Sequence, residues 1–141
     1  MIDKIVKTLQ EAGDSLREQA GHLGTGAKEK TYNLIDDWLK IFPKLEIYGL
    51  KVESFALGVA ISPSLEVDLR GSHEDFTMER IDEILAQPDS NGALRTVMST
   101  IKTTYNLHRR IYADLQEPLI VKIRVRISPE VKVFLGEPLI Q

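Results

Sequence analysis

The stretch Pro118-Leu-Ile-Val-Lys-Ile-Arg-Val-Arg-Ile-Ser-Pro-Glu-Val-Lys-Val-Phe-Leu135 decides the fold that we expect for this chain. Apolar residues occupy every odd position from Leu119 to Ile127, and the alternation resumes at Val131 after Ser-Pro-Glu. Alternation with period two is typical of strands that bury one face. Serine followed by proline suits a turn across which Ile127 would face Val131. The stretch therefore predicts a β-hairpin with one apolar face and one cationic face, which carries Lys122, Arg124 and Arg126.

A second stretch has the same design. Apolar residues alternate from Phe55 to Ile61, a Ser-Pro-Ser turn follows, and the alternation resumes from Leu65 to Leu69. A shorter alternation from Leu45 to Ile47 extends the prediction toward the N-terminus. We therefore expect an antiparallel sheet built from two hairpins, at about 45–70 and 118–136.

The polar faces of the two hairpins carry opposite charges. Glu66 and Asp68 lie on the first hairpin, and the basic row lies on the second. If the hairpins pair in one sheet, each opposed pair of charges contributes about 0.2–1 kcal/mol to stability. The basic row would then be neutralised inside the fold rather than by a partner.

The remaining segments have apolar residues at three- and four-residue spacing, which predicts amphipathic helices. A helix of about six turns is expected at the N-terminus. The four predicted helices span about 2–23, 27–42, 78–85 and 94–112, and Pro43 is expected to end the second of them. Apolar helix faces can cover the apolar face of the sheet, which gives an α+β fold.

The predicted organisation is one compact unit with two parts. Residues 1–43 form a helical arm or a helical hairpin, and residues 44–141 form the α+β domain. The sequence leaves open whether the first two helices fold back on each other or form one long helix, because Gly21, Gly24 and Gly26 interrupt the pattern between them.

Composition excludes several classes of protein. At 141 residues, with 43% hydrophobic and 28% charged residues, the chain has the composition of a single globular domain. It has no cysteine, so disulfide scaffolds, thiol catalysis and thiolate metal sites are excluded. The N-terminal pattern is amphipathic rather than that of a secretory signal, and no window approaches the ~18 apolar residues of a membrane span. We expect a cytoplasmic protein.

No group of residues indicates catalysis or a cofactor. His22, His73 and His108 share no metal-ligand spacing, and no cysteine could complete a zinc site. The glycines at 21–26 lack the preceding strand and the Gly-Lys-Ser or Gly-Lys-Thr ending of a phosphate loop. The sequence predicts a protein that is not an enzyme and that holds no metal or cofactor.

Charge is unevenly distributed along the chain. The net charge is −3, yet residues 95–132 contain eight basic residues and three acidic ones. Such polarity can be neutralised within the fold, between subunits or by an anionic partner, for which Arg109 and Arg110 are candidate anion-binding residues. Nucleic acid is not expected as a partner, because the chain is acidic overall and the basic strand carries no exposed ring.

We therefore expect an oligomerising or scaffold-like module whose partner is another protein or a second copy. The predicted contact residues come from the arm and the basic row: Ile2, Ile5, Val6, Leu9, Leu16, Lys122, Arg124 and Arg126. One alternative is a carrier for a lipid-like or small hydrophobic ligand, with room beside Ala56, Gly58 and Ala60. Another is a peripheral membrane protein whose N-terminal helix lies on an anionic membrane surface.

Overall fold

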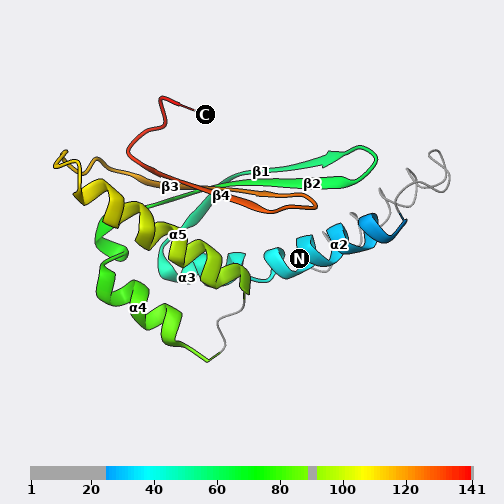
Figure 1. Cartoon of the computed structure of the whole chain (residues 1–141), viewed down its shortest axis with the longest axis horizontal. Helices are drawn as coiled ribbons and strands as arrows, with labels where there is room; N and C mark the ends of the chain where they lie inside the picture. The colour runs from blue at the N-terminus through cyan, green and yellow to red at the C-terminus, as the bar shows by residue number, and fades with distance from the viewer. Residues whose placement is uncertain (1–24, 89–91, 141) are drawn as a thin grey trace.

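The computed structural model describes residues 25–88 and 92–140, and its fold is α+β as predicted (Figure 1). Helices and two antiparallel hairpins follow one another along the chain. The elements are α2 (Thr25–Leu39), α3 (Phe42–Tyr48), β1 (Lys51–Val59), β2 (Pro63–Gly71), the 3-10 turn η1 (His73–Asp75), α4 (Met78–Ala86), α5 (Gly92–Arg109), β3 (Leu119–Val125) and β4 (Glu130–Leu135).

The four strands form one antiparallel sheet in the order β1-β2-β3-β4. The two hairpins therefore pair with each other through their inner strands. Glu66 lies opposite Arg124, and Asp68 lies opposite Lys122. The predicted meeting of the acidic and basic faces is confirmed. Figure 1 shows the helices on one side of this sheet and the C-terminal segment on the other.

The core lies between the helices and the odd-numbered residues of the inner strands. Alternate residues point to the same face of a strand, and the helix-facing set is buried, whereas the other face is more exposed except at Ile120. Helix α2 belongs to this core, because Ile35, Trp38 and Leu39 are buried in it. The strand and α5 side chains that meet α2 there include Leu65, Val67, Leu69, Val121, Ile123, Val125, Val97, Met98 and Ile101.

The strand expected from Leu45 is wrong, because this segment is the short helix α3. Pro43 lies in the first turn of α3, where a missing N–H costs nothing, instead of following the end of the preceding helix. Gly49 ends α3 in the left-handed conformation, with φ 114°. Leu45 is fully buried and Ile47 is exposed, so the two side chains do not share a face. The first hairpin therefore begins at Lys51.

The predicted pairing across the second turn is also wrong. The last paired residues of β3 and β4 are Arg124 and Glu130, so Ile127 lies at the tip of a wider turn and is exposed. The first hairpin behaves in the same way, since Val59 pairs with Pro63 and Ile61 lies at its tip. The pairing is displaced by an even number of residues, so each side chain keeps its predicted face.

Candidate functional site

The basic row lies on the outer face of the sheet, away from the helices. Arg124 Nε is 2.8 Å from Glu66 Oε1, and Lys122 Nζ lies 5.4 Å from the centroid of the Phe134 ring. Arg126 lies just beyond the end of β3 and is exposed. Two of the three predicted contact residues thus have partners within the sheet, and a role in binding another molecule stays a prediction for all three.

The predicted contact residues of the arm cannot be placed, whereas the residues of the predicted pocket can. Ile2, Ile5, Val6, Leu9 and Leu16 lie outside the described residues, so their role stays a prediction. Ala56 and Gly58, beside which the carrier hypothesis placed a ligand, pair with Glu66 and Ser64 on the outer face. They therefore do not line a space between the helices and the sheet.

The helix side of β1 carries an apolar surface that we call the β1 apolar row. It consists of Phe55, Leu57, Val59 and Ile61, which are 43%, 37%, 45% and 61% exposed. Phe55 pairs with the buried Val67, so the row lies on the same face as the core.

The β1 apolar row is more exposed than the same face of β2 and β3 because of where the helices lie. Helix α2 packs on β2 and β3, α5 packs on β4, and α3 reaches β1. Helix α3 ends only two residues before β1 begins, so it lies beside the start of this strand. We expected the row to be buried, but a period-two pattern does not show how far the covering helices extend.

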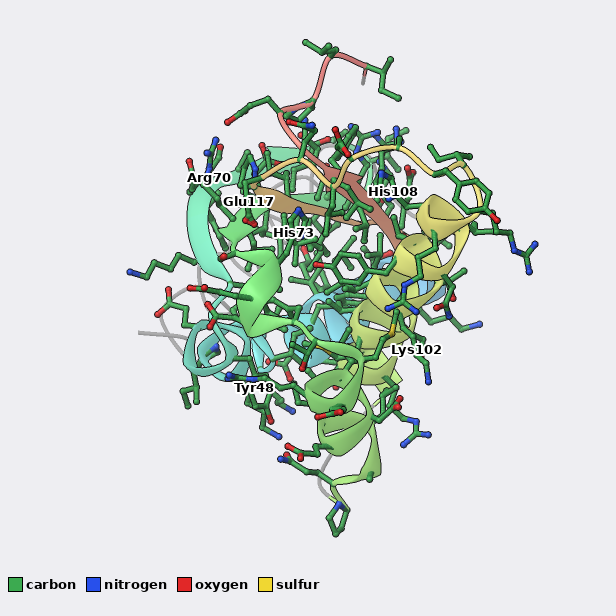
Figure 2. The ribbon with its side chains drawn as sticks, turned by 90° about the vertical axis from the view of Figure 1, so that its left-hand side faces the viewer. Tyr48, Arg70, His73, Lys102, His108 and Glu117 are labelled. Carbon is green, nitrogen blue, oxygen red and sulfur yellow. The ribbon has the colours of Figure 1, made fainter. Side chains whose placement is uncertain are left out.

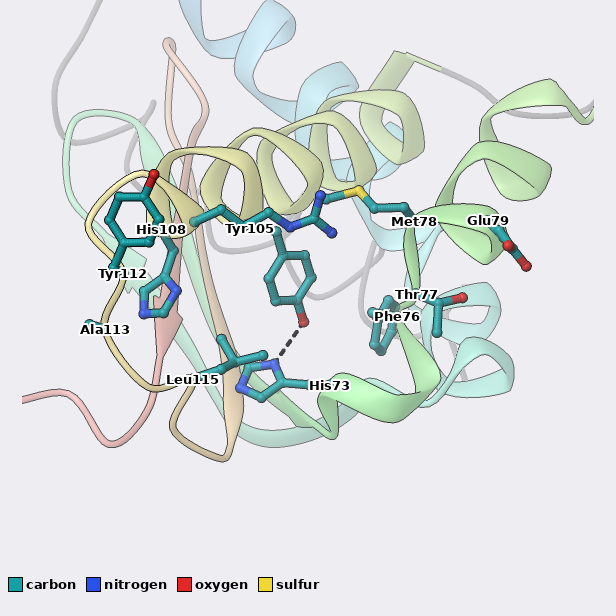
Figure 3. A pocket seen from close by; sticks show the side chains of 11 residues that line it. His73, Phe76, Thr77, Met78, Glu79, Tyr105, His108, Tyr112, Ala113 and Leu115 are labelled. Carbon is teal, nitrogen blue, oxygen red and sulfur yellow. Dashed lines mark hydrogen bonds between the residues drawn. The ribbon is translucent and has the colours of Figure 1, made fainter.

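A cleft lies where the end of α5 meets η1, the start of α4 and the loop after α5 (Figure 3). We call it the α5-end cleft. Its volume is about 560 Å³. The residues that line it are His73, Phe76, Thr77, Met78, Glu79, Tyr105, His108, Arg109, Tyr112, Ala113 and Leu115.

His73 and Tyr105 form the polar centre of the cleft. The Nδ1 atom of His73 is 2.7 Å from the Tyr105 hydroxyl, and its Nε2 atom is 2.5 Å from the carbonyl oxygen of Gln116. A carbonyl oxygen can only accept, so Nε2 carries a proton and donates to Gln116, while Nδ1 and the Tyr105 hydroxyl share the other hydrogen bond. Burial, assisted by the negative charge of Glu117, raises the pKa of Tyr105 above its ordinary value. Both rings are therefore held in place by hydrogen bonds within the protein.

Glu117 holds the loop after α5 against η1. Its Oε1 atom accepts a hydrogen bond from the backbone N–H of His73 at 2.8 Å, and its Oε2 atom accepts one from Ser72 Oγ at 3.3 Å. Figure 2 shows Glu117, His73 and Arg70 close to one another at this end of the molecule. Arg70 in turn pairs with Glu53 and with Glu137. The Glu117 carboxylate thus connects the loop after α5 to His73, which lines the cleft.

The two candidate anion-binding arginines are separated by the structure. Arg109 lines the cleft together with His108, whereas Arg110 does not line it. Sequence reasoning missed the cleft itself, because His73 and Tyr105 are 32 residues apart and belong to different elements. Tyr105 follows the apolar spacing of α5, so the pattern marks it only as a core residue.

Residues 25–88 and 92–140 contain neither a metal-binding cluster nor a membrane-spanning helix. Within these ranges, no three histidine, aspartate or glutamate residues gather closely enough to hold a metal ion. No helix among them combines the length and apolar character needed to cross a membrane.

Comparison with known proteins gives no match. No family model fits the chain, and no curated protein and no solved structure is similar to it. Function must therefore be inferred from the surfaces themselves.

Proposed function

We propose that this chain is a non-enzymatic association module that pairs with a second copy of itself through β1. The observation that carries the proposal is the β1 apolar row, which is exposed on the helix side of an edge strand. A contiguous exposed apolar patch marks an interaction surface, whereas single exposed apolar residues are normal.

The backbone edge of β1 favours the same use. An edge strand has a row of unpaired N–H and C=O groups, which proteins commonly protect with charged side chains, proline or bulges. A bulge lies between Val52 and Ser54, at the beginning of β1. From Ser54 to Leu65 the sequence contains no charged residue. Most of β1 and the turn after it therefore carry no charged side chain that would oppose pairing with another strand.

The opposite edge of the sheet differs from β1. Strand β4 has six residues, compared with nine in β1. Glu130 and Lys132 lie on it and are exposed. Charges on a short edge strand oppose pairing with another chain. The two edges thus differ in a way that favours β1 as the pairing strand.

A second copy is the simplest partner for such an edge. Two β1 strands can pair antiparallel about a two-fold axis, which continues the antiparallel pattern of the sheet. With the axis near Leu57, Phe55 of one copy faces Val59 of the other. The two apolar rows then lie side by side on one face of the combined sheet, where their side chains contact each other, while the strand edges exchange backbone hydrogen bonds.

The N-terminal arm offers a competing explanation, because its apolar residues could cover the row within the same chain. The two possibilities predict opposite effects of deleting residues 1–24. If the arm covers the row, deletion strengthens self-association. Under our proposal the arm adds contacts between copies, so deletion leaves self-association unchanged or weakens it.

Sedimentation equilibrium from micromolar to millimolar concentration tests the proposal. We expect a monomer–dimer equilibrium that Leu57→Lys weakens by roughly tenfold or more, because it places like charges opposite each other at the axis. Leu107→Lys is the control, since Leu107 is also exposed, at 55% compared with 37% for Leu57, but lies on α5. A chain that stays monomeric throughout, or equal effects of the two substitutions, would refute the proposal.

Cross-linking gives an independent test, because the chain contains no cysteine. A cysteine introduced by Ala56→Cys lies next to the proposed axis, so a short bis-maleimide should join two copies through it. A cysteine introduced by Lys132→Cys lies on the other edge and should remain largely unlinked. Preferential linking through position 132 would show that β4 is the pairing strand.

A further inference from the structure

The α5-end cleft has the size and the lining of a small-molecule site. Its volume of about 560 Å³ lies within the range of roughly 300–1,000 Å³ that is usual for such sites. Five of its lining residues carry rings: His73, Phe76, Tyr105, His108 and Tyr112. In Figure 3, Tyr105 stands between one end of the cleft, marked by His108 and Tyr112, and the other, marked by Glu79.

The centre of the cleft is a surface made of two rings. The Tyr105 hydroxyl and His73 Nδ1 are hydrogen-bonded to each other, and His73 Nε2 donates to the Gln116 carbonyl, so the polar atoms of both rings are engaged within the protein. The two rings meet edge to face, with centroids 5.5 Å apart and an angle of 75° between their planes. Such a surface suits a flat apolar ring better than a polar group.

The charge that faces the cleft near the end of α5 is positive. Arg109 lines the cleft, and within the described part of the chain its guanidinium has no carboxylate partner, in contrast to Arg70 and Arg124. A basic residue in the last turn of α5 also stabilises the helix end. Stabilisation of the helix end explains why a basic residue lies there, but it does not explain why the Arg109 side chain lines the cleft. A guanidinium suits a carboxylate, with which it can form two parallel hydrogen bonds.

Tyr112, which lines the cleft, has an unusual backbone conformation. Its φ angle is 54°, which bulky side chains rarely adopt, and the residue is 93% exposed. Backbone conformations of this kind occur at ligand-binding loops. The Tyr112 ring lies beside His108 in Figure 3, so it is placed to close over a ligand at this end.

We propose that the α5-end cleft binds a small planar aromatic molecule that carries one carboxylate. The ring packs against Tyr105 and Tyr112, and the carboxylate pairs with Arg109. This site is separate from β1, so the inference does not depend on self-association.

Titration of the full-length chain with indole-3-acetate, followed by protein NMR, tests the proposal. A ligand of this size with ordinary efficiency binds with a Kd of about 1 mM or tighter. We expect the largest shifts at Tyr105, His108 and Tyr112. Tryptamine has the same ring with a positive group, and acetate has the carboxylate without a ring. Both should bind at least about tenfold more weakly, because each lacks one of the two contacts.

Arg109→Gln and Arg110→Gln are matched variants, since the residues are adjacent and exposed but only Arg109 lines the cleft. We expect Arg109→Gln to weaken indole-3-acetate binding by roughly fivefold or more and Arg110→Gln to leave it unchanged. The spectra show whether each variant is folded. Equal binding of tryptamine or of acetate, equal effects of the two variants, or no binding of indole-3-acetate would overturn the proposal.

Discussion

Glu66 on β2 and Arg124 on β3 lie directly opposite each other, with 2.8 Å between Oε1 and Nε. Both side chains are almost half exposed, so water and salt screen their attraction. We expect a double-mutant cycle with Glu66→Gln and Arg124→Gln to give a coupling of about 0.2–1 kcal/mol, measured by urea unfolding. The coupling should fall as salt is added. A coupling that does not change with salt would contradict this view of the outer face.

Gly49 controls the passage from α3 to β1. Its φ of 114° is accessible to glycine, and an added Cβ would lie 3.0 Å from Asp75 Oδ2. We expect Gly49→Ala to destabilise the fold by about 1–2 kcal/mol in urea unfolding. Gly92→Ala is the control, since nothing lies within 4 Å of its Cβ position. It should be neutral or slightly stabilising, and similar losses in both variants would argue against a special role for Gly49.

Tyr105 should ionise at higher pH than a free tyrosine. Burial raises the pKa of Tyr105 above 10.0 in the folded state, so the folded chain keeps its proton at a pH where the unfolded chain loses it. The stability that Tyr105 contributes is complete below about pH 10 and is lost as the pH rises above that value. The difference between the absorbance titrations of wild type and Tyr105→Phe at the phenolate band isolates this group. A midpoint at or below 10 would contradict the burial.

The hydrogen bonds of Glu117 should hold the loop after α5 in place. Glu117→Ala removes the acceptor of the His73 N–H and Ser72 Oγ, and because these groups are exposed to water the loss should be about 0.5–1.5 kcal/mol. Hydrogen exchange at the His73 amide should become faster. Glu137→Ala is the control, because Arg70 retains its pairing with Glu53 when Glu137 is lost. Unchanged exchange at His73 in Glu117→Ala would show that the loop is held by other contacts.

The sheet could be predicted because its pattern is local. Val67 and Ile123 lie within unbroken alternations, and the face of each side chain depends only on whether its position is odd or even. The meeting of the acidic face with the basic face was expected on the condition that the two hairpins share a sheet, but the opposition of Glu66 and Arg124 was not predicted. The lengths of the turns could not be predicted, because the alternation around Ile61 and Ile127 allows two turn lengths that leave each side chain on the same face of the sheet.

The features that sequence reasoning missed depend on distant parts of the chain. The alternation of Leu45 and Ile47 is too short to be distinguished from one turn of helix, and the capping by Gly49 decides between them. His73 and Tyr105 meet only because η1 and α5 are brought together by the fold. The exposure of Leu57 depends on where α2 lies, which no pattern within β1 reports.

The unequal edges of the sheet have a consequence for the size of any assembly. A sheet with one open edge can be extended only once, because joining β1 to β1 leaves β4 at both outer borders of the combined sheet. Glu130 and Lys132 lie on those borders and oppose the addition of further strands. If the chain pairs through β1 as proposed, growth stops at two copies, and the charged β4 strand opposes the formation of fibres.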